Sequence, residues 1–470
     1  MIMFAMTRFE ACGNKMLTAL AALAASAVTF SASGQVATAP AADPMAAFKT
    51  DQGLISLTKA APIFTPVSDY RGQDIRTRAT LFGDPDGERS RLYEKGITLD
   101  AQVTQVYQGV TSGGNVRGNG SAEYNGLFEG NMTLDTGKLG WWSGGLFVLT
   151  EQSSWGRPLK SQAGNLSPVN ASALFPEPFE NSSVLMEYHL IQALPHDTLV
   201  VVGRVNPSNY LDQNSFAWLP ASQFFNESMN ANPLFGAFMS MSTYAALFMT
   251  KVSDSLTVAY GAWTPKTAVG EYDGEWNDYG VVINPQFKYK ASNQPGAFQA
   301  ILAYSSKDAT DVGNPRLVQG LATGSLPTKS GNWIAELSGE QYFWTPTRAP
   351  VPTKDFAVGQ PGFGMFYRIS FTPADRNFFN VYVSGGVGGR GVIPGRPHDR
   401  FGVGGYWLKK SSDLDRQPGN LLGDEKGMEA FYNFAITPAM QLSIDVQWIR
   451  PAIRLSSDAT VVGARLNLRF

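Results

Sequence analysis

Four charged side chains and one amide in this sequence have types and positions suited to binding a polyhydroxylated ligand. Glu129 in "LFEGNMTLD", Glu187 in "LMEYHLIQ", Arg204 in "VVGRVNPSNY" and Arg368 in "FYRISF" lie in stretches that alternate or mix apolar and polar residues, and Asn206 follows shortly after Arg204. A guanidinium fork that faces carboxylates can donate to and accept from hydroxyl groups at several points. We expect these side chains to share the inner face of a barrel and to line a sugar-binding passage. The alternative is that charges facing water in a wide pore need no ligand.

Such a site would bind weakly. A few hydrogen bonds at about 0.5 to 1.5 kcal/mol each approach the roughly 4 kcal/mol of a millimolar site. Aromatic side chains in the loops, such as Trp155, Trp218 and Trp276, are candidates to stack on the apolar face of a sugar ring. Weak binding would favour release, which conduction requires.

The sequence shows little apparatus for catalysis. It has 3 histidines, with neither an H-E-x-x-H pair nor a G-x-S-x-G turn. The stretch "GGVGGRG" at 385–391 lacks a following helix that would hold a phosphate. Glu336 and Glu340 share a strand face but would be about 13 Å apart, too far for a glycosidase pair. We therefore predict no enzyme, no cofactor and no metal site, although acids from different strands leave polysaccharide hydrolysis open as an alternative.

The elements that must position these side chains are β-strands, because apolar and polar residues alternate with a period of two. In the last strand, Val462, Leu466 and Phe470 fall on one face, whereas Arg465 and Asn467 fall on the other. About sixteen strands are expected, starting near Ile97, Gly126, Gly145, Val184, Leu199, Gly236, Leu256, Val281, Phe298, Asn332, Gly364, Phe378, Arg400, Glu429, Gln441 and Thr460.

Connection lengths favour a membrane barrel over a water-soluble β-sandwich. If the first strand rises from the periplasm, links on that side are short, as in "LPHD" and "ITP", whereas most links on the other side are long, as in Asn206–Pro233. An open sheet edge in hydrocarbon costs several kcal/mol for each unpaired backbone group, so such a sheet must close. We predict an all-β fold, a transmembrane antiparallel β-barrel of about 16 strands with long extracellular loops and a lumen open to water. The short link "TPADRN" and the longer link 345–361 break this pattern and put the strand count between Asn332 and Asn377 in question.

The N-terminus is predicted to be a targeting segment. Arg8 and Lys15 precede the apolar run "MLTALAALAASAVTF" and the small residues that follow it, which predicts a signal peptide over residues 1–33. A flexible periplasmic segment is expected over 34–82, with one or two helical turns at "GERSRLYEK", and the barrel over 83–470. Cys12, the only cysteine, would be lost with the signal peptide. The net charge of −2 argues against nucleic acid as a partner.

Several stretches resemble the carbohydrate-selective porins of the OprB family. "GERSRLYEKGITLD" is similar to the N-terminal segment of that family, and "LMEYHLIQ" with "VVGRVNPSNY" is similar to its paired strands that carry a Glu and then a basic or amide residue. "YRISFTPADRNFFNVYVSGGVGGRGVIPGRPHDRFGVG" resembles its most specific region, and "EAFYNFAITPAMQLSIDVQWIRP" resembles its closing hairpin. The chain departs from the family in "FGDPDGERSR", where a Trp-Gly-Gly turn is usual, and in the long loop after Asn206.

The resemblance implies an outer-membrane porin of a Gram-negative bacterium that admits mono- and disaccharides by facilitated diffusion, narrowed by inward loops and an Arg/Glu constriction. It also implies that the barrel-assembly machinery reads the C-terminal strand and Phe470. Small sugars and outer-membrane lipid are the expected partners, and a homo-oligomer is open. The competing interpretations are a β-rich enzyme that acts on polysaccharide and a barrel partner in surface polysaccharide export.

Overall fold

The computed structural model describes residues 74–115, 120–159, 161–173, 182–265, 277–346, 360–419 and 422–470. The predicted signal peptide, Cys12 and the first part of the N-terminal segment lie outside these ranges. Trp276 also lies outside them.

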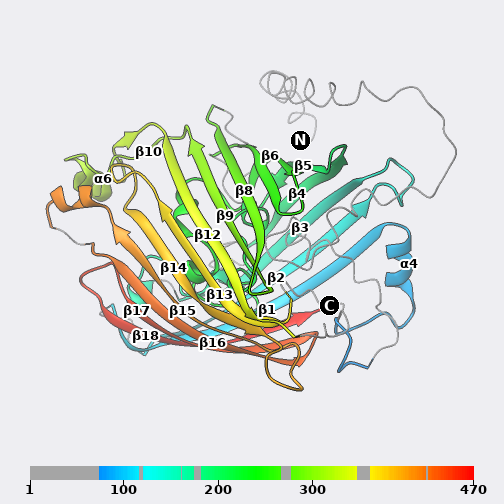
Figure 1. Ribbon diagram of the computed structural model, residues 1–470. Helices are drawn as coiled ribbons and strands as arrows, with labels where there is room; N and C mark the ends of the chain where they lie inside the picture. Colours follow the sequence, from blue (N-terminus) through cyan, green and yellow to red (C-terminus); the bar gives the residue numbers. More distant parts are fainter. Residues whose placement is uncertain are drawn as a thin grey trace, which may run out of the picture. The chain divides into compact units, whose positions relative to one another are not determined.

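Within the described residues, sixteen strands form one closed antiparallel barrel (Figure 1). Each strand pairs with its neighbours in the chain, and β1 closes the barrel by pairing with β18. The predicted fold class is therefore confirmed. The barrel strands are β1 (Ile97–Gly114), β2 (Ala122–Asp135), β3 (Gly145–Gly156), β4 (Ser183–Leu194), β5 (Thr198–Val205), β6 (Thr243–Lys251), β7 (Leu256–Trp263), β8 (Gly280–Ala291), β9 (Gln294–Ser305), β12 (Asn332–Trp344), β13 (Gly362–Phe371), β14 (Phe379–Arg390), β15 (Arg400–Lys410), β16 (Glu425–Thr437), β17 (Met440–Arg450) and β18 (Ser457–Arg469).

Short helices and one small hairpin lie in the connections. The predicted helical turns before the barrel are present as α4, and the chain leaves them through Gly96, whose φ of 92° an L side chain rarely adopts. The described elements are α4 (Glu88–Glu94), η2 (Ser161–Ala163), η3 (Ala171–Ala173), η5 (Pro207–Asn209), α5 (Glu227–Asn230), η6 (Pro233–Ala237), α6 (Leu317–Thr323), η7 (Ser412–Arg416) and the hairpin of β10 (Ala309–Thr310) with β11 (Thr328–Lys329). No helix in these ranges is long and apolar enough to cross a membrane.

The two ends of the barrel differ in their connections. At the terminal end, where β1 begins and β18 ends, β8 and β9 are joined through Ser292 and Asn293, both with positive φ, as tight hairpins require. At the opposite end, the loop end, β5 and β6 are joined by residues 206–242, which we call the inner loop. The link 345–361 lies at the terminal end and the link 372–378 at the loop end. Successive connections therefore alternate between the two ends throughout the barrel, and the strand count between Asn332 and Asn377 is as predicted.

One predicted strand start is wrong. Gly236 lies in η6, and β6 begins only at Thr243. The Asn232 side chain accepts a hydrogen bond from the backbone N–H of Leu234, and Pro233 occupies the first turn. Both features start a helix rather than a strand.

The period of two separates an apolar outer face from an inner face that is polar along much of the wall. Outward side chains such as Leu99, Val403 and Ile444 are exposed, whereas inward side chains such as Thr104 and Asn433 are buried. Because outward apolar side chains would contact lipid, this arrangement suits a membrane barrel.

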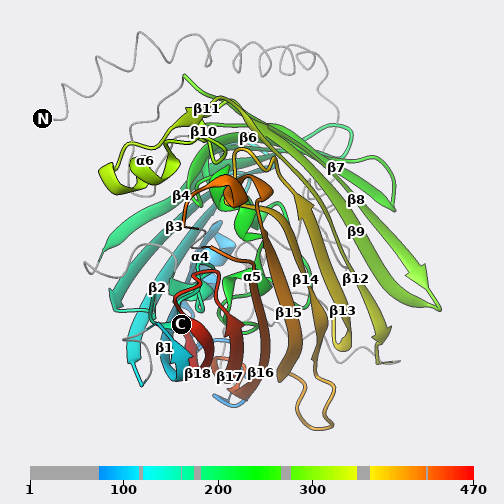
Figure 2. The same ribbon diagram turned by 90° about the vertical axis from the view of Figure 1, so that its left-hand side faces the viewer.

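The lumen is not open to water across its whole width, because an inward loop narrows it, as the family resemblance implies. The inner loop enters the barrel, and Figure 2 shows α5 between β2 on one side and β14 and β15 on the other. Apolar side chains of the inner loop pack against inward apolar residues of the wall. This core includes Val201, Leu211, Phe216, Phe224, Met229, Phe238, Leu247, Ile301, Ile334, Phe366 and Phe431. The strands behind this core carry apolar residues on both faces, as "TLVVVG" in β5 shows.

Candidate functional site

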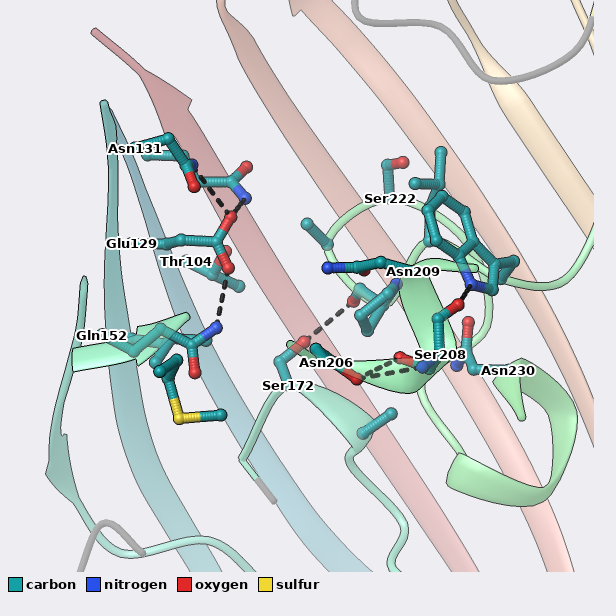
Figure 3. A pocket seen from close by; sticks show the side chains of 18 of the residues that line it. Thr104, Glu129, Asn131, Gln152, Ser172, Asn206, Ser208, Asn209, Ser222 and Asn230 are labelled. Carbon is teal, nitrogen blue, oxygen red and sulfur yellow. Dashed lines mark hydrogen bonds between the residues drawn. The ribbon is translucent and has the colours of Figure 1, made fainter. Parts of the chain in front are cut away.

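A cavity of about 240 Å³ remains on one side of the lumen, between the inner loop and the wall made by β1, β2 and β3 (Figure 3). Its volume is somewhat below the ~300 to 1,000 Å³ typical of pockets for drug-sized ligands, which suits a smaller molecule. It reaches the terminal end of the barrel, where Asp100, Arg469 and Phe470 contribute to its lining.

The strand register sets four polar side chains of the wall in one row across β18, β1, β2 and β3. Arg469 is opposite Gln102, Gln102 is opposite Glu129, and Glu129 is opposite Gln152. Residues directly opposite in an antiparallel sheet point to the same face, so all four side chains face the lumen. We call these four residues the polar row.

Neutral amides hold the carboxylate of the polar row. The side-chain N–H groups of Gln102 and Gln152 donate to the two oxygens of Glu129 at 2.9 and 2.7 Å, and Asn131 donates at 3.4 Å. Figure 3 shows Glu129 with Asn131 and Gln152 on one side of the cavity, and a dashed line marks the bond from Gln152. Glu129 is thereby fixed in orientation while it lines the cavity.

The inner loop presents an indole and several small polar groups to the opposite side of the cavity. Trp218 lines it, and its ring N–H donates to the carbonyl of Ser208 at 3.0 Å. The Asn206 side chain caps η5 by accepting from the backbone N–H of Ser208 at 3.1 Å and from its hydroxyl at 2.7 Å. Asn209 and Ser222 also point into this region (Figure 3).

Charged side chains on several strands of the wall form hydrogen bonds with the inner loop. On β13, the Arg368 guanidinium donates to the carboxylate of Asp212 at 2.5 Å and to the backbone carbonyls of Met229, Ala217 and Asn230 at 3.1, 2.8 and 3.1 Å. On β18, Arg465 donates to the carbonyl of Gln223 at 2.5 Å. These charge-assisted bonds position the loop edge that lines the cavity.

Buried carboxylates of the wall serve the same purpose. Glu429 on β16 accepts from the backbone N–H groups of Phe225 and Asn226 at 2.5 and 2.9 Å. On β12, Glu336 accepts from the Asn232 side chain at 2.6 Å, and Glu340 accepts from Ser215. The inner-face acids Glu336 and Glu340 therefore bind the loop and lie outside the cavity lining.

Of the five predicted site residues, Glu129 and Asn206 line the cavity. Glu187 and Arg368 do not line it, but they bind inner-loop residues that do. Glu187 accepts from the backbone N–H of Asn206 at 2.9 Å and from the Asn209 side chain at 2.8 Å. Arg368 is fully buried and its guanidinium is engaged by the inner loop.

Arg204 is not on the inner face, and this expectation is corrected. Its register partners are Tyr188 and Tyr244, and Val202, two residues earlier on the same face, is 40% exposed. The Arg204 guanidinium lies 5.5 Å from the Tyr244 ring, and its Nε donates to the Ser242 hydroxyl at 2.5 Å. In the apolar sequence "TLVVVGRV" the two faces carry similar residues, so the pattern does not identify the inner one.

Trp155 likewise faces outward, since its ring N–H donates to the Tyr124 hydroxyl, and Tyr124 is exposed on the outer face. The sequence interpretation missed Gln102, Gln152, Glu227 and Arg469, which all line the cavity. The alternation of the last strand does place Arg469 on the polar face, with Arg465 and Asn467, but only the register brings it into the row with Glu129.

Two groups of the inner loop have shifted pKa values. Burial, and secondarily the charge of Glu425, raises the pKa of Glu227 to about 7. Burial also raises the pKa of the Tyr210 hydroxyl, with the nearby Glu187 carboxylate as a smaller cause. In the described ranges, no group of three or more His, Cys, Asp or Glu residues could hold a metal ion.

A closed barrel whose lumen is narrowed by an anchored loop beside a cavity has the architecture of a channel protein. The sequence profile of the carbohydrate-selective porin, OprB family, matches residues 119–470. This chain therefore belongs to the OprB family, and it is a porin for carbohydrates in the bacterial outer membrane.

Solved porin structures share this fold. The high-pH structure of OprB from Pseudomonas putida has a TM-score of 0.70 and 19% sequence identity, and the match covers 84% of this chain and 99% of that chain. The low-pH structure of the same protein has a TM-score of 0.51 and 16% identity, with the same coverage. Comparison with curated proteins gave no match.

Proposed function

We propose that mono- and disaccharides diffuse passively through the cavity beside β1, β2 and β3, with the loop end facing the outside and the terminal end facing the periplasm. The observation that carries this proposal is the polar row, which faces Trp218 across the cavity. A sugar ring has polar edges and an apolar face, so it suits a passage with hydrogen-bonding groups on one side and an indole on the other.

The spacing of the polar row suits one sugar ring. Arg469 and Glu129 are two strands apart, which is roughly 10 Å. A guanidinium that donates at one edge of the ring and a carboxylate that accepts at the other would hold it from two sides. This pair would supply the Arg/Glu constriction that the family resemblance implies.

The test is recording of ion current through the protein in planar bilayers while sugars are added. We expect glucose or a disaccharide to block the current at millimolar concentration. Gln102→Leu removes one amide of the polar row, whereas Gln105→Leu makes the same change on the outer face of β1. Weaker block in Gln102→Leu alone supports the proposal, and absence of current or of block in the wild type would overturn it.

We also propose that the chain catalyses no reaction on its sugars. Support comes from Glu336 and Glu340, whose carboxylates bind the inner loop instead of facing the cavity. Release of reducing sugar from polysaccharide by the purified protein, lost in Glu336→Gln or Glu340→Gln, would contradict this. A barrel partner in polysaccharide export would conduct little, so the bilayer recording also separates that alternative.

The remaining proposals concern export and assembly. We propose that a signal peptide over residues 1–33 is cleaved and that residues 34–82 form a periplasmic segment. We also propose that the barrel-assembly machinery recognises Phe470. Whether the protein forms a homo-oligomer is to be measured. Mass spectrometry of the mature protein would test the cleavage. Deletion of Phe470 would test assembly, and light scattering would give the oligomeric state.

A further inference from the structure

Glu227 differs from the other acids of the cavity. It lies at the start of α5 in the inner loop and lines the cavity, and its backbone N–H donates to the Pro168 carbonyl at 2.9 Å. Among the described residues, no hydrogen bond or ion pair engages its carboxylate. Its backbone is therefore held in place while its side chain is available to a ligand.

The other lining acids have protein partners. Three amide side chains donate to Glu129, and Asp100 forms an ion pair with Arg89 at 3.3 Å. The wall acid whose charge acts on Glu227 is Glu425 on β16. The charged wall residues that line the cavity with Glu227 are Asp100, Glu129 and Arg469. Glu425 accepts from the backbone N–H groups of Leu166 and Ser167 at 2.6 and 3.0 Å, which are neutral donors.

This geometry sets a preference for charge. Two carboxylates near one another in a partly desolvated site raise the energy of their ionised forms, and a cation that enters lowers it. An anionic solute would meet repulsion at the same point. A neutral sugar would still find the polar row and Trp218.

We propose that Glu227 makes the passage prefer sugars that bear an ammonium group over sugars that bear a carboxylate or phosphate, with neutral sugars between them. This inference rests on the proposed sugar route. An ammonium group on the sugar would pair with the Glu227 carboxylate while the ring remains at the polar row.

The experiment measures uptake of radiolabelled glucose, glucosamine and gluconate into proteoliposomes at pH 7.5. Wild-type protein should take up glucosamine faster than gluconate. Glu227→Gln should reduce that ratio by about fivefold, the effect of one charge at about 4 Å in water. The matched control is Glu151→Gln, which removes a carboxylate from the outer face of β3.

A second variant tests the inference independently, in case Glu227→Gln does not fold. Met241 also lines the cavity, and Met241→Lys should reverse the preference by adding a cation there while Glu227 stays. Equal uptake of glucosamine and gluconate by wild type, or an unchanged ratio in both cavity variants, would overturn the inference while glucose uptake still supports the route. Absence of glucose uptake in every protein would instead overturn the proposed function.

Discussion

Replacement of Arg368 by Met should open the channel. Arg368 is fully buried, and its guanidinium joins β13 to the inner loop through the Asp212 carboxylate and the carbonyls of Met229, Ala217 and Asn230. Methionine has a similar length but none of these donors. The barrel itself is held by backbone hydrogen bonds between strands, so we expect it to remain closed while the loop loosens.

The expected cost follows from what the substitution leaves behind. Asp212 is 6% exposed in its side chain, so removing Arg368 leaves a buried carboxylate without its cation. Breaking a buried ion pair from one side costs about 3 to 5 kcal/mol. Adding Asp212→Asn to Arg368→Met should recover part of this loss because the orphaned charge is removed.

The assay is single-channel conductance, with and without glucose, for wild type, Arg368→Met and the double variant. Conductance should rise and glucose block should weaken in Arg368→Met, and the double variant should lie between it and wild type. Arg91→Met on α4 is the control because the Arg91 side chain is 58% exposed. Unchanged conductance and block in Arg368→Met, with the protein folded, would refute the anchoring role.

Three further predictions address the cavity and the barrel seam. Because burial and Glu425 raise the pKa of Glu227 to about 7, lowering the pH from 8 to 6 adds a proton and removes a negative charge, so the cation preference of the ion current should fall. Reversal potentials in a KCl gradient measure this, and a fall of equal size in Glu227→Gln would contradict the assignment. Trp218→Ala should weaken glucose block several-fold, since an aromatic contact contributes about 0.5 to 1.5 kcal/mol, and block as strong as in wild type would exclude stacking on the indole. Arg89→Ala removes a 2.7 Å hydrogen bond to the carbonyl of Leu99 at the β1–β18 seam and should lower the temperature at which the barrel changes its electrophoretic mobility, whereas the exposed Arg91→Ala should not.

The sequence predicted the barrel because the alternation of polar and apolar residues within a strand shows which side chains point inward and which point outward. In β18 the polar side chains of Arg465, Asn467 and Arg469 alternate with apolar ones, and the structure places the first set inward. A period of two is a local property, readable without knowledge of the neighbouring strands. The same pattern correctly placed Glu129, Glu187 and Arg368 on the inner face.

The alternation failed where both faces of a strand are apolar. The inner loop buries its own apolar side chains against β5, so Val201 faces a packed core while Val202 faces outward. The sequence of β5 thus carried no signal for the face of Arg204. The path of the inner loop was equally hidden, because loops lack a period that pattern reasoning can use.

The sequence by itself determined the closed sheet, its approximate strand number and the polarity of most strand faces. Tertiary structure decided which inward charges line the cavity and which hold the loop. Arg465 and Arg469 share one face of β18, yet Arg465 binds the inner loop whereas Arg469 belongs to the polar row. That distinction depends on strand register and on where the connection 206–242 folds. Both are set by contacts between residues far apart in the chain, which no local pattern records.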